Sequence, residues 1–399
     1  MSEVTTRISK LQEAIAGFGF DGWLFTDFHN RDAISYRVLG MEEGKFTSRR
    51  WFYFVPAQGE PQRLVHAVEK RKLDSLPGEK TVYLPWEQLH AELRRILGTP
   101  GKIAMQYSPN NNIPYVDLVD PGLVELVRSF GHIVVSSADL VQQFEAVLSV
   151  EQLQTHIDAG VHVQRIKDEA FARIEAAIKR GEPETEHAIQ QFIIRSFEEA
   201  GLTCDQEWPI VAVNGHAADP HFEPLPDNTL PIRAGDMILI DLWARQNKPG
   251  AIYYDITWCG FAGANPPAEY VSIFAVIMAA RDAAFALVKE RFERGEPLHG
   301  YEVDRACRAV VEAAGYGPHF VHRTGHSIGT AVHGNGVHMD SLETKDERLL
   351  VPGICFSIEP GIYLEGNMGV RTEIDAFIGH DGVARFSGEL QTELVLLEA

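Results

Sequence analysis

The feature of the sequence that most constrains its fold is an internal repeat in the C-terminal two-thirds of the chain. The segment RAGDMILIDLW is matched by LVPGICFSIEPG, and IYYDITW is matched by VRTEIDAF. Aligned on Gly235 and Gly353, the two copies lie 118 residues apart. The same offset relates two acids of the first copy to two acids of the second, Asp241 to Glu359 and Asp255 to Glu373.

Each copy carries a helical pattern ahead of its strand-like segments. The stretches ETEHAIQQFIIRSFEEAG and EVDRACRAVVEAAG place apolar residues at helical spacing, and each leads to a short apolar run. We interpret residues 146–399 as two helix-and-hairpin units related by a pseudo-twofold axis. Residues 1–145 instead alternate short helices with strand-like runs, which is typical of a small α/β domain. The sequence therefore predicts an α/β (α+β) protein of two domains.

The four repeated acids lie in or directly after apolar, strand-like runs. A single acid at a strand end is more often solvated, or caps a neighbouring helix, than it is functional. Four acids at matched positions favour a shared site. Two like charges about 4 Å apart repel by roughly 4 kcal/mol at an effective dielectric near 20, so such a site needs cations. Two divalent ions would balance the four charges, and the pattern therefore predicts a dinuclear metal centre.

The stretch HRTGHSIGTAVHG supplies a nitrogen ligand and also raises an alternative. His322 and His326 are four residues apart, but Gly325 and Gly329 argue against the helix of an H-E-x-x-H zinc site. The same stretch contains G-x-S-x-G, the nucleophile motif of serine hydrolases, with Ser327 at its centre. That motif needs a following helix and two further triad members, for which the later glycines leave little room. We favour His326 as a metal ligand and keep a serine esterase as a remote alternative.

Composition narrows the functional classes. The formal net charge is −20 and the pI is near 5.2, which opposes binding to nucleic acid or to anionic membranes. The four cysteines lack C-x-x-C spacing, so neither a disulfide framework nor a thiolate zinc site is expected. The first residues, MSEVTTRISK, show no apolar signal region, and the apolar stretch YVSIFAVIMAA is shorter than a membrane span. We expect a cytoplasmic protein.

The C-terminal two-thirds of the sequence resembles the pita-bread metallopeptidases, which include methionine aminopeptidase, aminopeptidase P and prolidase. The matching segments are ILID (238–241), YDIT (254–257), HRTGHSIG (322–329), SIEPG (357–361) and VRTEID (370–375). The resemblance implies a pita-bread fold for residues 146–399. It also implies five metal ligands, of which Asp255 and Glu373 bridge the two ions: Asp241, Asp255, His326, Glu359 and Glu373. Residues 1–145 are similar to the amino-terminal domain of the creatinase and prolidase branch, which favours Xaa-Pro substrates and a homodimer.

By this resemblance the chain is expected to hydrolyse the bond before proline in Xaa-Pro dipeptides, using a hydroxide that bridges two divalent ions. Mn(II) is the first choice of metal, with Co(II), Zn(II) or Fe(II) as alternatives, because four carboxylates and an imidazole without a thiolate suit these ions. Glu359 is the expected proton shuttle between water and the leaving nitrogen. His221 and His333 match family histidines that hold the substrate and stabilise the tetrahedral intermediate.

Substrate recognition leaves more alternatives open. The candidate substrate-binding residues are His322, Arg348 and Arg371, and either arginine could bind a dipeptide carboxylate. Arg371 could instead orient Glu373. Four aromatic residues near the first two acids could form a slot for the proline ring or belong to the core: Trp243, Tyr253, Tyr254 and Trp258.

The chain also departs from the family pattern near the expected substrate pocket. RQNKPG (245–250) resembles an insertion, GNGVHMD follows His333 where an acid and a proline are usual, and Trp258 stands where arginine is usual. The motifs therefore constrain metal binding more than specificity. An aminopeptidase P that takes longer peptides and a hydrolase of a non-peptide amide are the alternatives within the enzyme class.

Overall fold

The computed structural model describes residues 3–398 of the chain, which form two compact units, one ending at Glu145 and the other beginning at Ala146. Both units combine helices with sheets. The mixed α/β class expected from the sequence is therefore confirmed.

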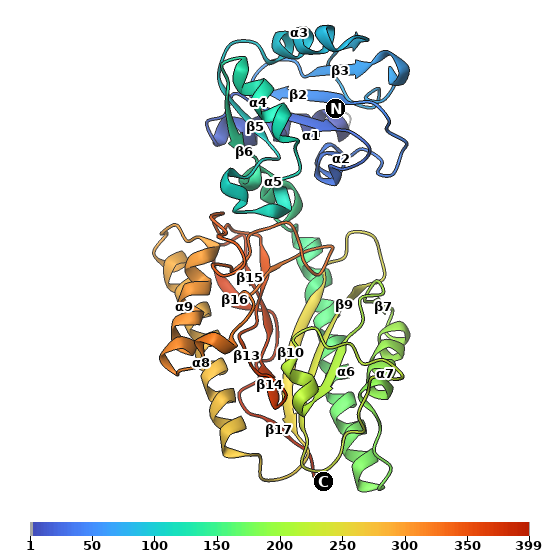
Figure 1. Cartoon of the computed structure of the whole chain (residues 1–399), viewed down its shortest axis with the longest axis vertical. Coiled ribbons are helices and arrows are strands. Elements are labelled where there is room, and N and C mark those ends of the chain that lie inside the picture. Colours follow the sequence, from blue (N-terminus) through green and yellow to red (C-terminus); the bar gives the residue numbers. More distant parts are fainter. Residues whose placement is uncertain (1–2, 399) are drawn as a thin grey trace. The chain divides into compact units, whose positions relative to one another are not determined.

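The amino-terminal unit is built on one six-stranded sheet with strand order β4-β3-β2-β1-β5-β6 (Figure 1). Its strands are β1 (Gly22–Asp27), β2 (Trp51–Pro56), β3 (Gln62–His66), β4 (Glu79–Tyr83), β5 (Lys102–Met105) and β6 (Ile133–Ser136). Its α-helices are α1 (Glu3–Gly17), α2 (Ala33–Leu39), α3 (Trp86–Leu97), α4 (Pro121–Ser129) and α5 (Ala138–Glu145).

Alternating side chains divide this unit into two apolar layers. In β1, Trp23 and Phe25 belong to a cluster with residues of α1, α2 and α5, whereas Leu24 belongs to a cluster with residues of α3 and α4. Successive side chains of a strand point to opposite faces, so each face of the sheet carries its own layer of helices.

The second unit contains three sheets: β17-β10-β9-β7 with β8 also paired to β9, β11-β12-β15-β16, and the hairpin β13-β14. Its α-helices are α6 (Val150–Lys179), α7 (Glu186–Glu199), α8 (Ala268–Glu293) and α9 (Gly300–Ala313). The strands of its first half are β7 (Leu202–Thr203), β8 (Ile210–Val213), β9 (Met237–Gln246) and β10 (Tyr254–Phe261). Those that follow are β11 (Ser327–Ile328), β12 (Cys355–Ile358), β13 (Gly361–Leu364), β14 (Met368–Arg371), β15 (Ile374–Ile378), β16 (Ala384–Phe386) and β17 (Val395–Leu396).

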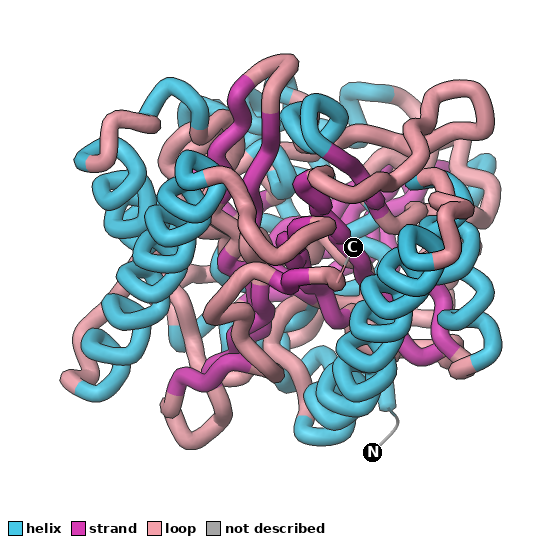
Figure 2. Tube along the Cα trace, turned by 90° about the horizontal axis from the view of Figure 1, so that it is seen from below, coloured by secondary structure: helices cyan, strands magenta, loops and turns pink. Residues whose placement is uncertain are grey.

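The strands of this unit lie between two pairs of helices, α6 with α7 and α8 with α9 (Figures 1 and 2). Helix α6 packs on β9 and β10, and α8 packs on β12, β13, β14 and β16. All eight residues of β10 are buried. A strand that is covered on both faces reads as a continuous apolar run, which explains why an acid within it, Asp255, is conspicuous.

The two copies of the repeat pair their strands in different registers. In the first copy Asp241 lies opposite Thr257. The same pairing in the second copy would place Glu359 opposite Asp375, but Ser357 holds that position. The second copy also contains the extra hairpin β13-β14 between its two long strands. Because the slip is two residues, each side chain keeps the same face of its sheet.

Helix α8 is long and apolar enough, by length and composition, to cross a membrane, with 26 residues and a mean hydropathy of 1.9 in its most apolar window. The expectation that this stretch is shorter than a span is therefore wrong. Its Ile273 and Ile277 belong to the main apolar cluster of the unit. Its Arg281 is buried, and Nη1 donates to the carbonyl oxygen of Gln391 at 2.8 Å. One side of α8 therefore packs into the core of the unit.

Close contact between α6 and β10 depends on Gly160. A Cβ atom added at Gly160 would lie 2.5 Å from a ring carbon of the buried Tyr254. We expect Gly160→Ala to lower the free energy of unfolding by about 1–3 kcal/mol, because an extra methyl group must displace a packed ring. Gly122→Ala, in α4, is the control, since nothing lies within 4 Å of a Cβ there. Denaturant unfolding measures both, and an unchanged stability of Gly160→Ala would contradict this packing.

Candidate metal centre

The structure brings together five side chains from both copies of the repeat. Asp241 lies on β9 and Asp255 on β10, while His326 directly precedes β11. Glu359 directly follows β12, and Glu373 lies between β14 and β15. All five line one cavity of about 100 Å³. The convergence of the acids that the repeat predicts is therefore present in the fold.

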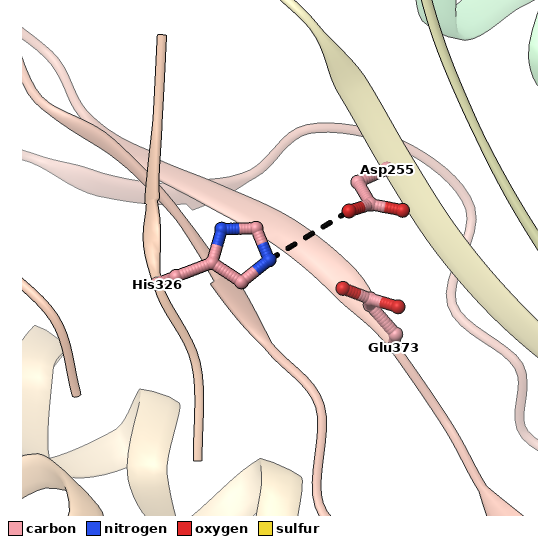
Figure 3. Close-up of side chains that lie close together, drawn as sticks. All are labelled: Asp255, His326 and Glu373. Carbon is pink, nitrogen blue, oxygen red and sulfur yellow. Dashed lines mark ion pairs between the residues drawn. The ribbon is translucent and has the colours of Figure 1, made fainter. Parts of the chain in front are cut away.

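Three of these residues form a tight cluster (Figure 3). One ligand atom from each of Asp255, His326 and Glu373 lies within 4.8 Å of the others. Nε2 of His326 is 3.7 Å from Oδ2 of Asp255 and 3.4 Å from Oε1 of Glu359. The backbone around His326 can pass this close to β12 because Gly325 has no side chain: a Cβ there would lie 1.9 Å from the carbonyl oxygen of Ser357.

Burial makes this arrangement electrostatically costly without cations. Asp241, Asp255 and Glu373 are each at most 6% exposed. Burial raises the pKa of Asp255 and Glu373 well above the ordinary range, and neighbouring carboxylates raise both further. Burial also raises the pKa of Glu359 to about 7, although Arg371 opposes this shift. Without compensating positive charge, some of these carboxyl groups would hold protons at neutral pH.

The donor set fits two divalent cations. Oδ1 of Asp241 and Oδ1 of Asp255 are buried and accept no hydrogen bond from any residue between 3 and 398. Such oxygens are costly unless a cation or a donor meets them. Burial lowers the pKa of His326 well below its ordinary value, so its ring is neutral and can offer a lone pair to a metal. Carboxylate and imidazole ligands suit manganese, cobalt, iron or zinc.

Arg371 lies within the protein beside the acids and is fully engaged there. Its guanidinium pairs with Asp241, and its Nη1 donates to the hydroxyl oxygen of Tyr363 at 3.0 Å. Its Nε donates to Oγ1 of Thr257 at 3.1 Å, and that hydroxyl donates to Oε2 of Glu373 at 2.7 Å. Of the two expected roles for Arg371, the structure favours positioning of the acids over binding of a free substrate carboxylate.

Other side chains complete the lining of the cavity. His221 and His333 both line the cavity, and the rings of His333 and His326 meet edge to face with centroids 4.4 Å apart. Ile210, Pro220, Trp243 and Val332 form an apolar wall, and Glu207 completes the lining.

Two of the substrate-binding residues proposed from the sequence, His322 and Arg348, do not line this cavity. His322 lies behind it, where its Nε2 is 2.8 Å from the hydroxyl oxygen of Tyr363. Arg348 is buried in an ion pair with Asp346 and donates to the carbonyl oxygen of Asn335 at 2.8 Å. Neither side chain is placed to meet a substrate in the cavity.

Ser327 does not form a nucleophile elbow. It lies in the two-residue strand β11, which no helix follows directly. Its Oγ is committed to the backbone, because it accepts a hydrogen bond from the N–H of Gly336 at 3.0 Å. The serine esterase alternative is overturned by this geometry, since that motif requires an exposed serine between a strand and a helix.

Of the four aromatic residues considered for a proline slot, Trp243 alone lines the cavity. Tyr253 and Tyr254 are core residues, with hydroxyl groups bonded to Asp205 at 2.6 Å and Gln164 at 3.0 Å. Trp258 lies under the ammonium group of Lys167, 3.4 Å from the ring centroid.

Sequence analysis missed two supporting residues that the repeat itself could have revealed. Thr257 and Asp375 each lie two residues after a repeated acid and are themselves 118 residues apart. Thr257 of the first copy donates to Glu373 of the second, and Asp375 of the second accepts from the backbone N–H of Asp255 at 2.7 Å. Each copy therefore supports an acid of the other copy.

Comparison with known proteins identifies relatives of this chain. The profile of metallopeptidase family M24 matches residues 161–380, slightly more than half of the chain. A probable dipeptidase PepE from Mycobacterium tuberculosis is 28% identical over 260 residues, which cover 65% of this chain and 63% of that protein. An Xaa-Pro dipeptidase from Lactobacillus helveticus is 32% identical over 178 residues, which cover 45% of this chain and 44% of that protein. The matches thus span less than two-thirds of each relative.

A solved structure shows the same fold over the whole chain. Dipeptidase PepE from Mycobacterium ulcerans superposes with a TM-score of 0.69 at 23% identity, covering 99% of this chain and 98% of that one. The pita-bread fold expected from the sequence is thereby confirmed.

Removal of one acid should separate metal binding from folding. In metal-free protein, Glu373→Gln should raise the thermal unfolding temperature, because the neutral amide replaces an acid that this crowded, buried cluster accepts only when a proton neutralises it. The same change should abolish most of the stabilisation that Mn(II) gives to the wild type, since an ion that binds only the folded state stabilises it by mass action. Glu199→Gln, on the exposed end of α7, should alter neither temperature. Equal responses to Mn(II) in wild type and Glu373→Gln would contradict the site.

The stability of metal-free protein should fall as the pH rises. Because burial raises the pKa of Glu359 from about 4.5 to about 7, the folded protein holds this proton more tightly than the unfolded chain does. The resulting stabilisation is complete below about pH 4.5 and is lost as the pH rises to about 7, by roughly 3 kcal/mol. Thermal unfolding between about pH 5 and 8 measures this loss, and Glu359→Gln should reduce it. Identical pH profiles for the two proteins would show that Glu359 is not responsible.

Proposed function

The chain belongs to metallopeptidase family M24, and from this premise we propose that it is a metal-dependent peptidase that hydrolyses the bond before proline in Xaa-Pro dipeptides. The observation that carries the proposal is the convergence of four carboxylates and His326 on one small cavity. The dipeptidases among the relatives support the dipeptide substrate for this chain.

The residues of the cavity suggest which group carries out each step of the hydrolysis. Two divalent ions held by the five ligands would supply Lewis acidity, which polarises the scissile carbonyl and makes a water molecule easier to deprotonate. Glu359, a carboxylate of the cavity lining, can accept a proton from the attacking water and pass it to the leaving nitrogen. His221 and His333 line the same cavity, and we assign to them hydrogen bonds to the carbonyl oxygen as it gains negative charge.

Arg371 and Thr257 hold metal-ligating carboxylates in place, and other residues bind the substrate. Arg371 fixes Asp241 through its guanidinium, and Thr257 fixes one oxygen of Glu373. Groups that hold metal ligands in a fixed orientation increase the affinity of those ligands for the metal, and they do so without contacting the substrate.

A second candidate is an aminopeptidase that takes longer Xaa-Pro peptides. Arg371 is committed to Asp241, and Arg348 lies outside the cavity, so neither arginine is placed to bind a dipeptide carboxylate. A site without such a contact would tolerate a chain that continues past proline.

Further proposals concern the metal, assembly and location. Mn(II) is our first choice of ion, and a homodimer, with residues 1–145 as a creatinase- and prolidase-type domain, follows from the family resemblance. A cytoplasmic location is supported by four cysteines that are all free and buried.

Turnover of matched peptides tests the proposal. We expect the Mn(II)-loaded protein to cleave alanyl-proline and to lose this activity when a chelator removes the metal. Comparison with alanyl-prolyl-glycine separates the dipeptidase from the aminopeptidase, and alanyl-alanine measures the preference for proline. A metal-loaded protein that cleaves none of the three peptides would overturn the proposed function.

The role of Glu359 predicts a specific loss. Glu359→Gln cannot shuttle a proton, so we expect kcat for alanyl-proline to fall by at least about 100-fold. Elemental analysis of the same preparation should show how much metal is retained, and kcat per bound metal is the quantity to compare. A variant that retains both its metal and wild-type kcat would exclude Glu359 as the shuttle.

A further inference from the structure

The cavity wall contains one acid that the proposed chemistry does not use. Glu207 lines the cavity together with the five ligands, and its side chain is exposed at the mouth. No hydrogen bond or ion pair to its carboxylate is found among residues 3–398. Its backbone N–H, by contrast, is fixed, since it donates to the carbonyl oxygen of Cys204 at 2.9 Å.

A strained and anchored turn holds Glu207 in this position. Asp205 and Gln206 both adopt the left-handed conformation, with φ of 51° and 69°, which is costly for residues other than glycine. Arg245 of β9 donates to both oxygens of Asp205 at 2.8 and 2.9 Å, and the hydroxyl group of Tyr253 donates to Oδ2 at 2.6 Å. The turn is thus tied to β9, the strand that carries Asp241.

The remaining charges of the cavity show which ligand Glu207 suits. The lining contains five acids and one arginine, and that arginine, Arg371, is paired with Asp241. The carboxylate of Glu207, by contrast, has no cationic side chain paired with it among the described residues, which leaves it available to a positive charge on the ligand. A peptide with a free amino terminus carries the complementary charge within a few bonds of its scissile carbonyl.

We propose that Glu207 is a specificity-determining residue that binds the α-ammonium group of the peptide substrate. This inference rests on the proposed peptidase function and adds to it the requirement for a free amino terminus. Glu207 acts in binding and takes no part in the proton transfers, so its loss should change KM much more than kcat.

The test compares substrates with and without the amino group. For alanyl-proline we expect Glu207→Gln to raise KM about fivefold, as for a partly exposed ion pair, with kcat within about twofold of the wild type. Propionyl-proline is the same molecule without the amino group, and its affinity as a competitive inhibitor should be the same for both proteins. Glu199→Gln removes an equal charge from the exposed end of α7 and should leave every value unchanged.

The measured KM and inhibition constants show whether Glu207 binds the α-ammonium group. The inference is overturned if Glu207→Gln weakens alanyl-proline and propionyl-proline equally, if it leaves the KM for alanyl-proline unchanged, or if Glu199→Gln has the same effect. Thermal unfolding of each variant shows whether a loss reflects folding. A wild-type protein that cleaves no peptide overturns the proposed function and this inference together, whereas an active wild type with an unselective Glu207→Gln overturns the inference alone.

Discussion

Mutual repulsion among buried carboxylates is the constraint on which the rest of this structure depends. Asp241, Asp255 and Glu373 are nearly inaccessible to solvent, and Glu359 is 15% exposed. A protein interior does not tolerate four such charges unless protons or cations neutralise them. Helices pack against both sides of the strands that carry the acids, so the fold holds the four carboxylates close together. Bound cations would then relieve the repulsion between them.

The duplicated architecture explains how so small a cavity is assembled. The acids of one copy are supported by groups of the other, through Thr257 on Glu373 and Asp375 on the backbone of Asp255. The symmetry is then broken where chemistry requires it, since His326 and Arg371 have no counterparts with the same role. The lining of the cavity also includes apolar side chains such as Trp243 and Val332.

The sequence predicted the acids because their spacing repeats, and His326 because it lies in a histidine-rich, glycine-broken stretch. It could not predict the partner of Arg371, because Asp241 is 130 residues away and no local pattern links the two. The sequence places Asp346 two residues before Arg348, but it does not show that the two form a buried ion pair inside the fold. The role of Glu207 depends on a left-handed turn at two non-glycine residues, which propensity does not reveal. The repeat spacing in the sequence therefore predicts which residues ligate the metal. The residues that surround each metal ligand depend on tertiary contacts that the sequence does not reveal.

On this interpretation, two divalent ions would occupy the space between these five side chains. Anomalous X-ray diffraction from crystals grown with Mn(II) tests it most directly, because the scattering locates each ion without reference to activity. We predict two peaks per chain, both within coordination distance of Asp255 and Glu373. Peaks confined to other parts of the molecule, or no peak beside these two acids at saturating Mn(II), would contradict the account.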